Sequence, residues 1–201
     1  MSHELLSLRG QWKNLRLSSK RMKFIAELQS MAAPITSVPA FKLGIFSATT
    51  WRPLLPFATA ELLLEGVRLE SSLHEYEAMA AAIATGENEF DSALLVMDDL
   101  EAYGDLYDPS IKWNAQMSAS LLSSFVIRID RLRKCTRQLI VTLPPKPPSN
   151  PIGLDGAAEG GSHSQRIRAF SSALEGELEL RPGVESFSIE SALAEIGQLQ
   201  A

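Results

Sequence analysis

The stretch Leu43-Gly-Ile-Phe-Ser-Ala-Thr-Thr50 reads as a short apolar strand that ends in a hydroxyl-rich turn. Pro53 and Pro56 follow at the expected start of a helix, where a missing backbone donor is tolerated, and Gly66 suits the end of that helix. Loops after the carboxyl ends of parallel strands are where α/β proteins bind ligands. We therefore expect Ser47, Thr49 and Thr50 to lie at a functional edge.

The rest of the chain repeats this alternation of short strands and helices, which is typical of a parallel sheet covered by helices. We expect a three-layer α/β sandwich, flavodoxin-like or SGNH-like, with a parallel sheet of about five strands. The expected strands are 42–47, 67–71, 92–97, 138–143 and 184–188, and the longest expected helix is 112–134. A short helix over 189–196 is expected to close the fold.

Residues 1–38 predict a helical N-terminal extension, which leaves 39–201 as the α/β domain. This extension is basic, and Leu8, Trp12 and Leu15 form a narrow apolar stripe within it. Such stripes usually pack on their own domain, which is the interpretation we favour. A helix lying on a membrane surface is the alternative.

The composition is that of a folded protein, with 201 residues, 45% hydrophobic content and a net charge of -5. This charge argues against broad nucleic-acid binding, so carrier proteins or small molecules are the expected partners. The longest apolar run, Leu54 to Leu64, is interrupted by Pro56 and Glu61 and reads as a core helix. The N-terminus has no apolar signal core, so we expect a cytoplasmic protein and no role at a membrane.

Side chains that carry chemistry are few. Cys135 is the only cysteine, which excludes an internal disulfide, and we expect it to be a small buried residue. Asp98 and Asp99 follow the third expected strand, at the same edge as Ser47, and are candidate binding residues. They lack the spacing that metal-assisted phosphoryl chemistry needs, so we expect no metal and no cofactor.

Two histidines and an asparagine complete the candidate site. His74 is expected just after the second strand, where it could line the same crevice. A loop rich in proline and glycine, which includes Asn150, leads to His163, the only late histidine. This loop is either functional or mobile.

In its order of segments, the chain resembles the N-terminal domain of FkbH-like proteins. The resemblance rests on the stretch from Leu43 to Leu55, on Glu65-Gly-Val67, on Leu94-Leu-Val-Met-Asp-Asp-Leu100, on Asn150-Pro-Ile-Gly153 and on the closing helix from Ile189 to Gly197. It covers about residues 40 to 197. Full-length members of the family join an SGNH-hydrolase-like domain to a haloacid-dehalogenase-type domain of subfamily IIIC.

The resemblance implies a role in the biosynthesis of polyketides and related secondary metabolites, where these proteins supply a glyceryl-type unit to a carrier protein. The phosphate chemistry of the family depends on an Asp-x-Asp-x-Thr or Asp-x-Asp-x-Val motif of the second domain, and this sequence contains neither. The implied partners are an acyl carrier protein or a separate phosphatase-like subunit, together with an acyl or glyceryl intermediate.

The SGNH resemblance also implies ester hydrolysis or acyl transfer with Ser47 as nucleophile and His163 as base. A serine hydroxyl needs a neighbouring imidazole to remove its proton. The usual Gly-Asp-Ser is replaced here by Ile45-Phe-Ser47, and the late Asp-x-x-His motif is absent. His74 is the other histidine that could serve.

Three functions stay open from the sequence. The first is a noncatalytic accessory domain that recognises a carrier protein, a partner enzyme or an intermediate. The second is a hydrolase or acyltransferase that uses Ser47. The third is a purely structural interaction protein. Spatial proximity between the Ser47 hydroxyl and a histidine nitrogen discriminates between the second function and the others.

Overall fold

The computed structural model describes most of the chain, namely residues 3–15, 18–30, 38–75, 77–86, 89–97, 100–108, 110–144 and 163–188. Its helices are α1 (His3–Lys13), α2 (Ser18–Ser30), α4 (Leu55–Leu64), α5 (Glu77–Thr85), α6 (Leu100–Tyr107), α7 (Ala115–Leu132) and α8 (His163–Glu179). Its strands are β1 (Ala40–Ser47), β2 (Arg68–Glu75), β3 (Phe90–Leu95), β4 (Thr136–Thr142) and β5 (Val184–Phe187).

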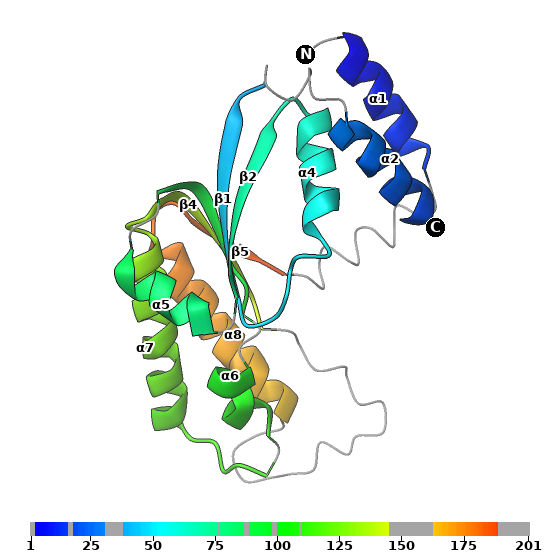
Figure 1. Cartoon of the computed structure of the whole chain (residues 1–201). Helices are drawn as coiled ribbons and strands as arrows, with labels where there is room; N and C mark the ends of the chain where they lie inside the picture. The colour runs from blue at the N-terminus through cyan, green and yellow to red at the C-terminus, as the bar shows by residue number, and fades with distance from the viewer. Residues whose placement is uncertain are drawn as a thin grey trace. The chain divides into compact units, whose positions relative to one another are not determined.

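These strands form one five-stranded sheet in the order β2-β1-β3-β4-β5 (Figure 1). The pairs β3–β4 and β4–β5 are parallel, and Ile140 of β4 lies opposite both Leu94 and Glu185. This is the flavodoxin-like doubly wound order, in which the chain reverses its direction of winding between β1 and β3. The predicted three-layer α/β fold with a parallel sheet of five strands is confirmed.

Several element boundaries follow from local chemistry. Pro56 lies in the first turn of α4, and Gly66 follows the helix with a φ of 83°, a conformation that glycine adopts without strain. Asn114 caps α7, because its side chain accepts a hydrogen bond of 2.9 Å from the backbone N–H of Met117. The predicted helix over 112–134 therefore begins three residues later than expected.

The chain divides into two compact units. The larger unit contains β3, β4, β5, α5, α6, α7 and α8, together with residues 45–49 at the end of β1 and His74 and Glu75 of β2. Its four helices lie together over the strands (Figure 1). A single apolar core joins them, and it includes Leu139 and Val141 of β4, Ile129 of α7 and Leu174 of α8, all with no exposed surface.

An ionic cluster holds α7 and the end of α8 together. The Nε of Arg181 donates to Asp130 at 2.9 Å, and its Nη1 pairs with Glu177 at 2.9 Å. The hydrogen bond to Asp130 is the main cause that raises the pKa of Arg181 above its ordinary value. Gly183, with a φ of 76°, then turns the chain into β5.

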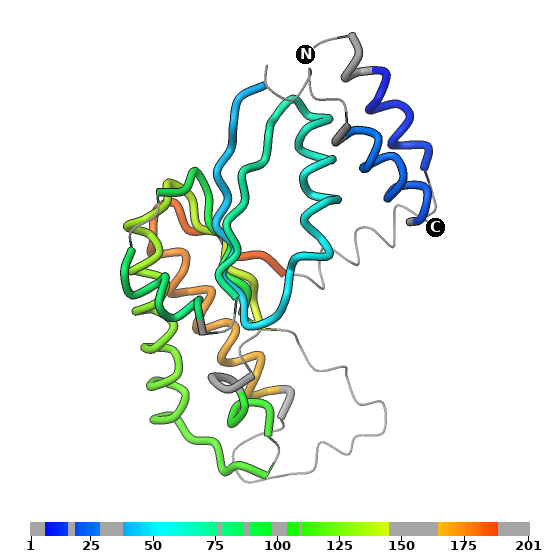
Figure 2. Tube along the Cα trace, viewed as in Figure 1, coloured from blue at the N-terminus to red at the C-terminus, as the bar shows by residue number. Residues whose placement is uncertain are grey.

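The smaller unit contains α1, α2 and α4 with the greater part of β1 and β2 (Figure 2). Its core is formed by Trp12 of α1, by Phe24, Ile25 and Leu28 of α2, and by Ala60, Leu63 and Leu64 of α4. The expectation that the Trp12 stripe packs on its own domain is thus confirmed. The boundary at residue 38 stays a prediction.

Helix α4 is the core helix expected from Leu54 to Leu64, with Ala60, Leu63 and Leu64 buried. Among the described residues, no helix is both long enough and apolar enough to cross a bilayer. The predicted last helix over 189–196 lies outside the described residues.

Cys135 is buried, as expected. Its Sγ lies 3.5 Å from the carbonyl oxygen of Gly86 and 3.6 Å from that of Arg131. Among the residues described here, no three His, Cys, Asp or Glu side chains gather as a metal ion would need.

Candidate functional site

The carboxyl ends of β1 and β3 lie side by side at the point where the winding reverses, which is where doubly wound folds bind ligands. The backbone N–H of Val96 donates to the carbonyl of Phe46 at 2.8 Å and joins the two strand ends. Ser47 is the last residue of β1. The structure therefore places Ser47 where the sequence predicts the functional edge.

The hydroxyl of Ser47 is part of the turn that follows the strand. Its Oγ accepts a hydrogen bond of 3.0 Å from the backbone N–H of Thr49, and it lies 3.3 Å from the Oγ1 of Thr49, with either hydroxyl able to donate. The Ser47 side chain has 0% exposed surface, whereas Thr49 and Thr50 are exposed. Such hydroxyl-to-backbone bonds stabilise turns. Of the two residues joined in this turn, Ser47 is buried and Thr49 is exposed.

Thr142 is a second buried hydroxyl near this edge, and it was not predicted from the sequence. It ends β4, and its Oγ1 accepts a hydrogen bond of 2.8 Å from the backbone N–H of Met97, just after β3. A threonine at the end of an apolar strand is the signal that could have indicated it. The bond fixes where the chain leaves β3, directly before Asp98.

His74 lies inside β2, so the prediction that it follows the second strand is wrong. Strand β2 continues to Glu75 because its last residues still pair within the sheet, although Ser71 and Ser72 are exposed and give no apolar signal. The imidazole stacks on the ring of Phe46 with 4.6 Å between centroids and 16° between planes. It also meets Phe90 edge-on at 6.0 Å.

The His74 Nε2 is buried without a hydrogen-bond partner. Desolvation by burial lowers the pKa of the imidazole below its ordinary value, since the charged form loses more hydration than the neutral form. The ring is therefore an aromatic packing partner that favours the neutral state.

Ser47 and His74 lie on opposite sides of β1. Successive side chains of a strand point to opposite faces, so the hydroxyl of Ser47 faces away from the side on which Phe46 projects. His74 stacks on Phe46 and thus lies on that other side. The structure does not bring the imidazole of His74 to the hydroxyl of Ser47.

The other candidates fall beyond what the structure describes. His163 begins α8, but its side chain is not among the described ones. Asp98, Asp99 and Asn150 lie outside the described residues altogether. Their roles in catalysis or binding stay predictions.

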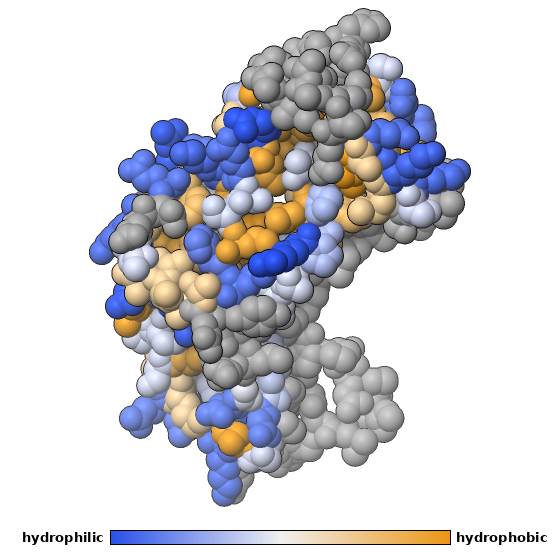
Figure 3. Space-filling model, viewed as in Figure 1, coloured by the Kyte–Doolittle hydropathy of each residue, from blue (hydrophilic) through white to orange (hydrophobic). Residues whose placement is uncertain are grey.

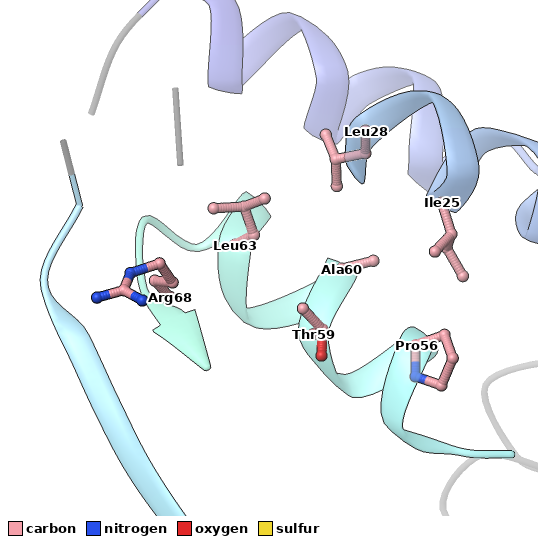
Figure 4. Close-up of a pocket in the computed structure, with 7 residues that line it drawn as sticks. All are labelled: Ile25, Leu28, Pro56, Thr59, Ala60, Leu63 and Arg68. Carbon is pink, nitrogen blue, oxygen red and sulfur yellow. The ribbon is translucent and has the colours of Figure 1, made fainter. Parts of the chain in front are cut away.

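The smaller unit contains a hollow that the sequence did not indicate (Figure 4). Its volume is about 40 Å³, and the residues that line it are Ile25, Leu28, Pro56, Thr59, Ala60, Leu63 and Arg68. The guanidinium of Arg68 pairs with Glu70 at 2.7 Å. This hollow is a small apolar gap between α2 and α4, and it contains none of the predicted site residues.

Comparisons with known proteins place the fold but not the family. No family model and no curated protein matches the sequence. The crystal structure of the N-terminal part of the protein BF1531 from Bacteroides fragilis, which contains a phosphatase domain and is complexed with Mg, is similar with a TM-score of 0.59. The identity is 15%, over 81% of this chain and 44% of that one. The chain thus spans less than half of that structure and shares its fold.

Proposed function

We propose that this chain is an FkbH-related accessory domain that recognises a partner of a biosynthetic pathway without performing chemistry itself. Two observations support the relationship. The segments from about residue 40 to 197 resemble the FkbH-like N-terminal domain in order, and a similar fold occurs in the N-terminal part of a protein that contains a phosphatase domain. An SGNH-like character of the α/β domain belongs to the same proposal.

The observation that carries the proposal is that Ser47 is buried and hydrogen-bonded within its own turn. A serine nucleophile must be reachable by substrate and must lie within hydrogen-bond reach of a base. Here the Ser47 side chain has 0% exposed surface, and its Oγ is bonded within its own turn. His74 packs on the other side of β1. These features suit a structural hydroxyl better than a nucleophile.

Phosphoryl chemistry is not proposed for this chain either. The family's phosphatase-like domain uses two aspartates in an Asp-x-Asp motif, and the 201 residues contain no such pair. Phosphate removal would then fall to a phosphatase-like domain or subunit outside these 201 residues. The partners we propose are such a subunit or an acyl carrier protein that carries an acyl or glyceryl intermediate, in the cytoplasm of a cell that makes polyketides or related secondary metabolites.

The test combines an activity probe with a binding measurement. Wild type, Ser47→Ala and a control variant Ser120→Ala, altered at an exposed serine of α7, are incubated with a fluorophosphonate probe and a panel of acyl esters. Binding of an acyl carrier protein is measured by calorimetry. We expect no labelling, no ester turnover and measurable binding for all three proteins.

A serine hydrolase or acyltransferase is the second candidate, favoured by the position of Ser47 at the end of β1. Labelling and turnover that Ser47→Ala abolishes and Ser120→Ala retains would establish it and overturn the accessory function. Absence of activity, of binding to the carrier protein and of binding to a phosphatase-like subunit measured in the same way would overturn the accessory function in favour of a structural interaction protein.

A further inference from the structure

The charge of the chain is distributed unevenly. Residues 1–30 contain six Lys and Arg and two Glu, which gives them a net charge of +4, while the whole chain has -5. Lys13 of α1 and Lys20 and Lys23 of α2 are exposed. Figure 3 shows hydrophilic side chains over the α1–α2 part of this view. Arg9 pairs with Glu65, so the exposed positive charge of the described N-terminal helices rests on these lysines.

The inner side of these helices is firmly held. Phe24, Ile25 and Leu28 of α2 are buried in the core of the smaller unit. Arg21 connects α2 to α1, because its Nε donates to the carbonyl of Leu15 at 2.8 Å and its guanidinium lies 5.1 Å from the centre of the Trp12 ring. The opposite side of α2 is thus presented on a fixed support.

This opposite side combines an apolar centre with a small net positive charge, because Lys20 and Lys23 outnumber the exposed Glu27, which lies one turn after Lys23. Ser19, Met22, Lys23 and Ala26 follow the spacing that puts residues on one helix face, and all four are exposed. Met22 is 46% exposed and has Lys20 and Lys23 nearby in the sequence. In the part of the chain that the structure describes, neither lysine forms an ion pair. We call Ser19, Lys20, Met22, Lys23, Ala26 and Glu27 the α2 outer face.

We propose that the α2 outer face docks an acidic helix of a partner protein, an inference that rests on the proposed function. Carboxylates of the partner helix would face Lys20 and Lys23, and an aliphatic side chain would cover Met22. Interfaces with an apolar centre and complementary charge at the rim are typical of protein recognition. Methionine adapts its shape to different partners, which suits such a centre.

The structure favours a protein over a membrane as the occupant. Membrane-surface helices insert a broad apolar face that often includes tryptophan. Here the apolar stripe of α2 faces the core, and Trp12 is only 3% exposed with its indole bonded to Glu61. Met22 is the single large apolar side chain on the α2 outer face. The net charge of -5 disfavours a nucleic-acid partner, because the rest of the protein is acidic and would repel the phosphates.

The experiment measures binding of an acidic acyl carrier protein to the full chain by calorimetry at two salt concentrations. The test variant is Lys20→Glu with Lys23→Glu, and the matched control is Lys112→Glu with Lys134→Glu, which reverses two exposed lysines of the other unit. We expect the test variant to weaken binding by roughly tenfold or more and the control to leave it nearly unchanged. Higher salt should weaken wild-type binding as well. Circular dichroism verifies that both variants fold.

The outcomes separate this inference from the proposed function. If wild type and the test variant bind the carrier protein equally, the α2 outer face is not the docking site, although the accessory function stands. If wild type does not bind it, the inference fails, and the accessory function stands only for a phosphatase-like partner. Binding to anionic vesicles of phosphatidylcholine and phosphatidylglycerol, lost in the test variant and without carrier-protein binding, would instead assign this face to a membrane.

Discussion

The indole Nε1 of Trp12 donates a hydrogen bond of 2.6 Å to Oε1 of Glu61 and thereby connects α1 to α4. Glu65, the C-cap residue of α4, pairs with Arg9 of α1 at 2.6 Å. The Trp12 ring is buried beside Phe24, with 5.7 Å between their centroids. Helix α1 is therefore bound to α4 by packing and by two charge-assisted contacts.

Replacement of Trp12 tests this connection. We expect Trp12→Ala to lower the free energy of unfolding by about 3–5 kcal/mol, because a large buried side chain is removed. Trp12→Phe should lower it by about 1–3 kcal/mol, since it loses the bond to Glu61 and part of the packing. Urea denaturation measures both, with Lys13→Ala at the next, exposed position as control. A change of less than about 0.5 kcal/mol for Trp12→Ala would mean that α1 is not part of the folded unit.

The turn at Ser47 leads to a second prediction. Ser47→Ala removes the acceptor for the N–H of Thr49 and should lower the free energy of unfolding by about 1 kcal/mol. Ser47→Leu should lower it by about 1–3 kcal/mol, because a fully buried site has no room for a larger side chain. Thermal denaturation of both variants against Ser120→Ala verifies this. A tolerated leucine would show that Ser47 faces open space, contrary to the structure.

The burial of His74 predicts a dependence of stability on pH. Its pKa is lowered in the folded state, so the unfolded chain takes up the proton first as the pH falls below about 6.5. Above a pH of about 6.5, the neutral ring makes its full contribution to the free energy of unfolding. This contribution decreases as the pH falls toward the pKa of the folded state and is constant below that.

Urea denaturation of wild type and His74→Phe at several pH values from about 7.5 to 5 measures this contribution. Phenylalanine preserves an aromatic ring beside Phe46 but does not titrate. The free energy of unfolding of wild type should decrease relative to that of the variant as the solution is acidified. Parallel pH profiles would show that His74 is not desolvated in the folded protein.

Two glycines form a matched pair. Gly183 has a φ of 76°, and a Cβ there would lie 3.1 Å from the carbonyl oxygen of Arg137, so Gly183→Ala should lower the free energy of unfolding by about 1–2 kcal/mol. Gly176 is helical with no atom within 4 Å of an added Cβ, so Gly176→Ala should raise it by about 0.5–1 kcal/mol. Effects of the same sign in thermal denaturation would contradict the turn geometry.

The sheet could be predicted from the sequence because its apolar strands are separated by clear breaks such as Gly66 and Gly86. Helix α6 was missed, since eight residues that include Gly104 give a weak helical signal. The end of β2 was placed too early because exposed Ser71 and Ser72 interrupt its pattern. That error moved His74 from the strand into a loop.

The candidate site was less accessible to sequence reasoning. The edge of the sheet on which the site lies could be predicted, because alternating strands and helices indicate a parallel sheet. Ser47 and His74 are separated because Ser47 points to one face of β1 while His74 packs on the other, against Phe46. The face on which His74 lies depends on how β2 pairs within the sheet, which the local sequence does not reveal. The bond between Thr142 and Met97 likewise joins residues 45 positions apart.

The position of β1 between β2 and β3 also bears on how the protein is made. On the ribosome, β1 is synthesised before β2 and β3. The buried end of β1, Gly44 to Ser47, therefore has no neighbouring strand to pair with at that stage. A nascent chain that stops before Phe90 leaves one backbone edge of β1 open. Until β3 emerges, this open edge can pair with the strands of other chains.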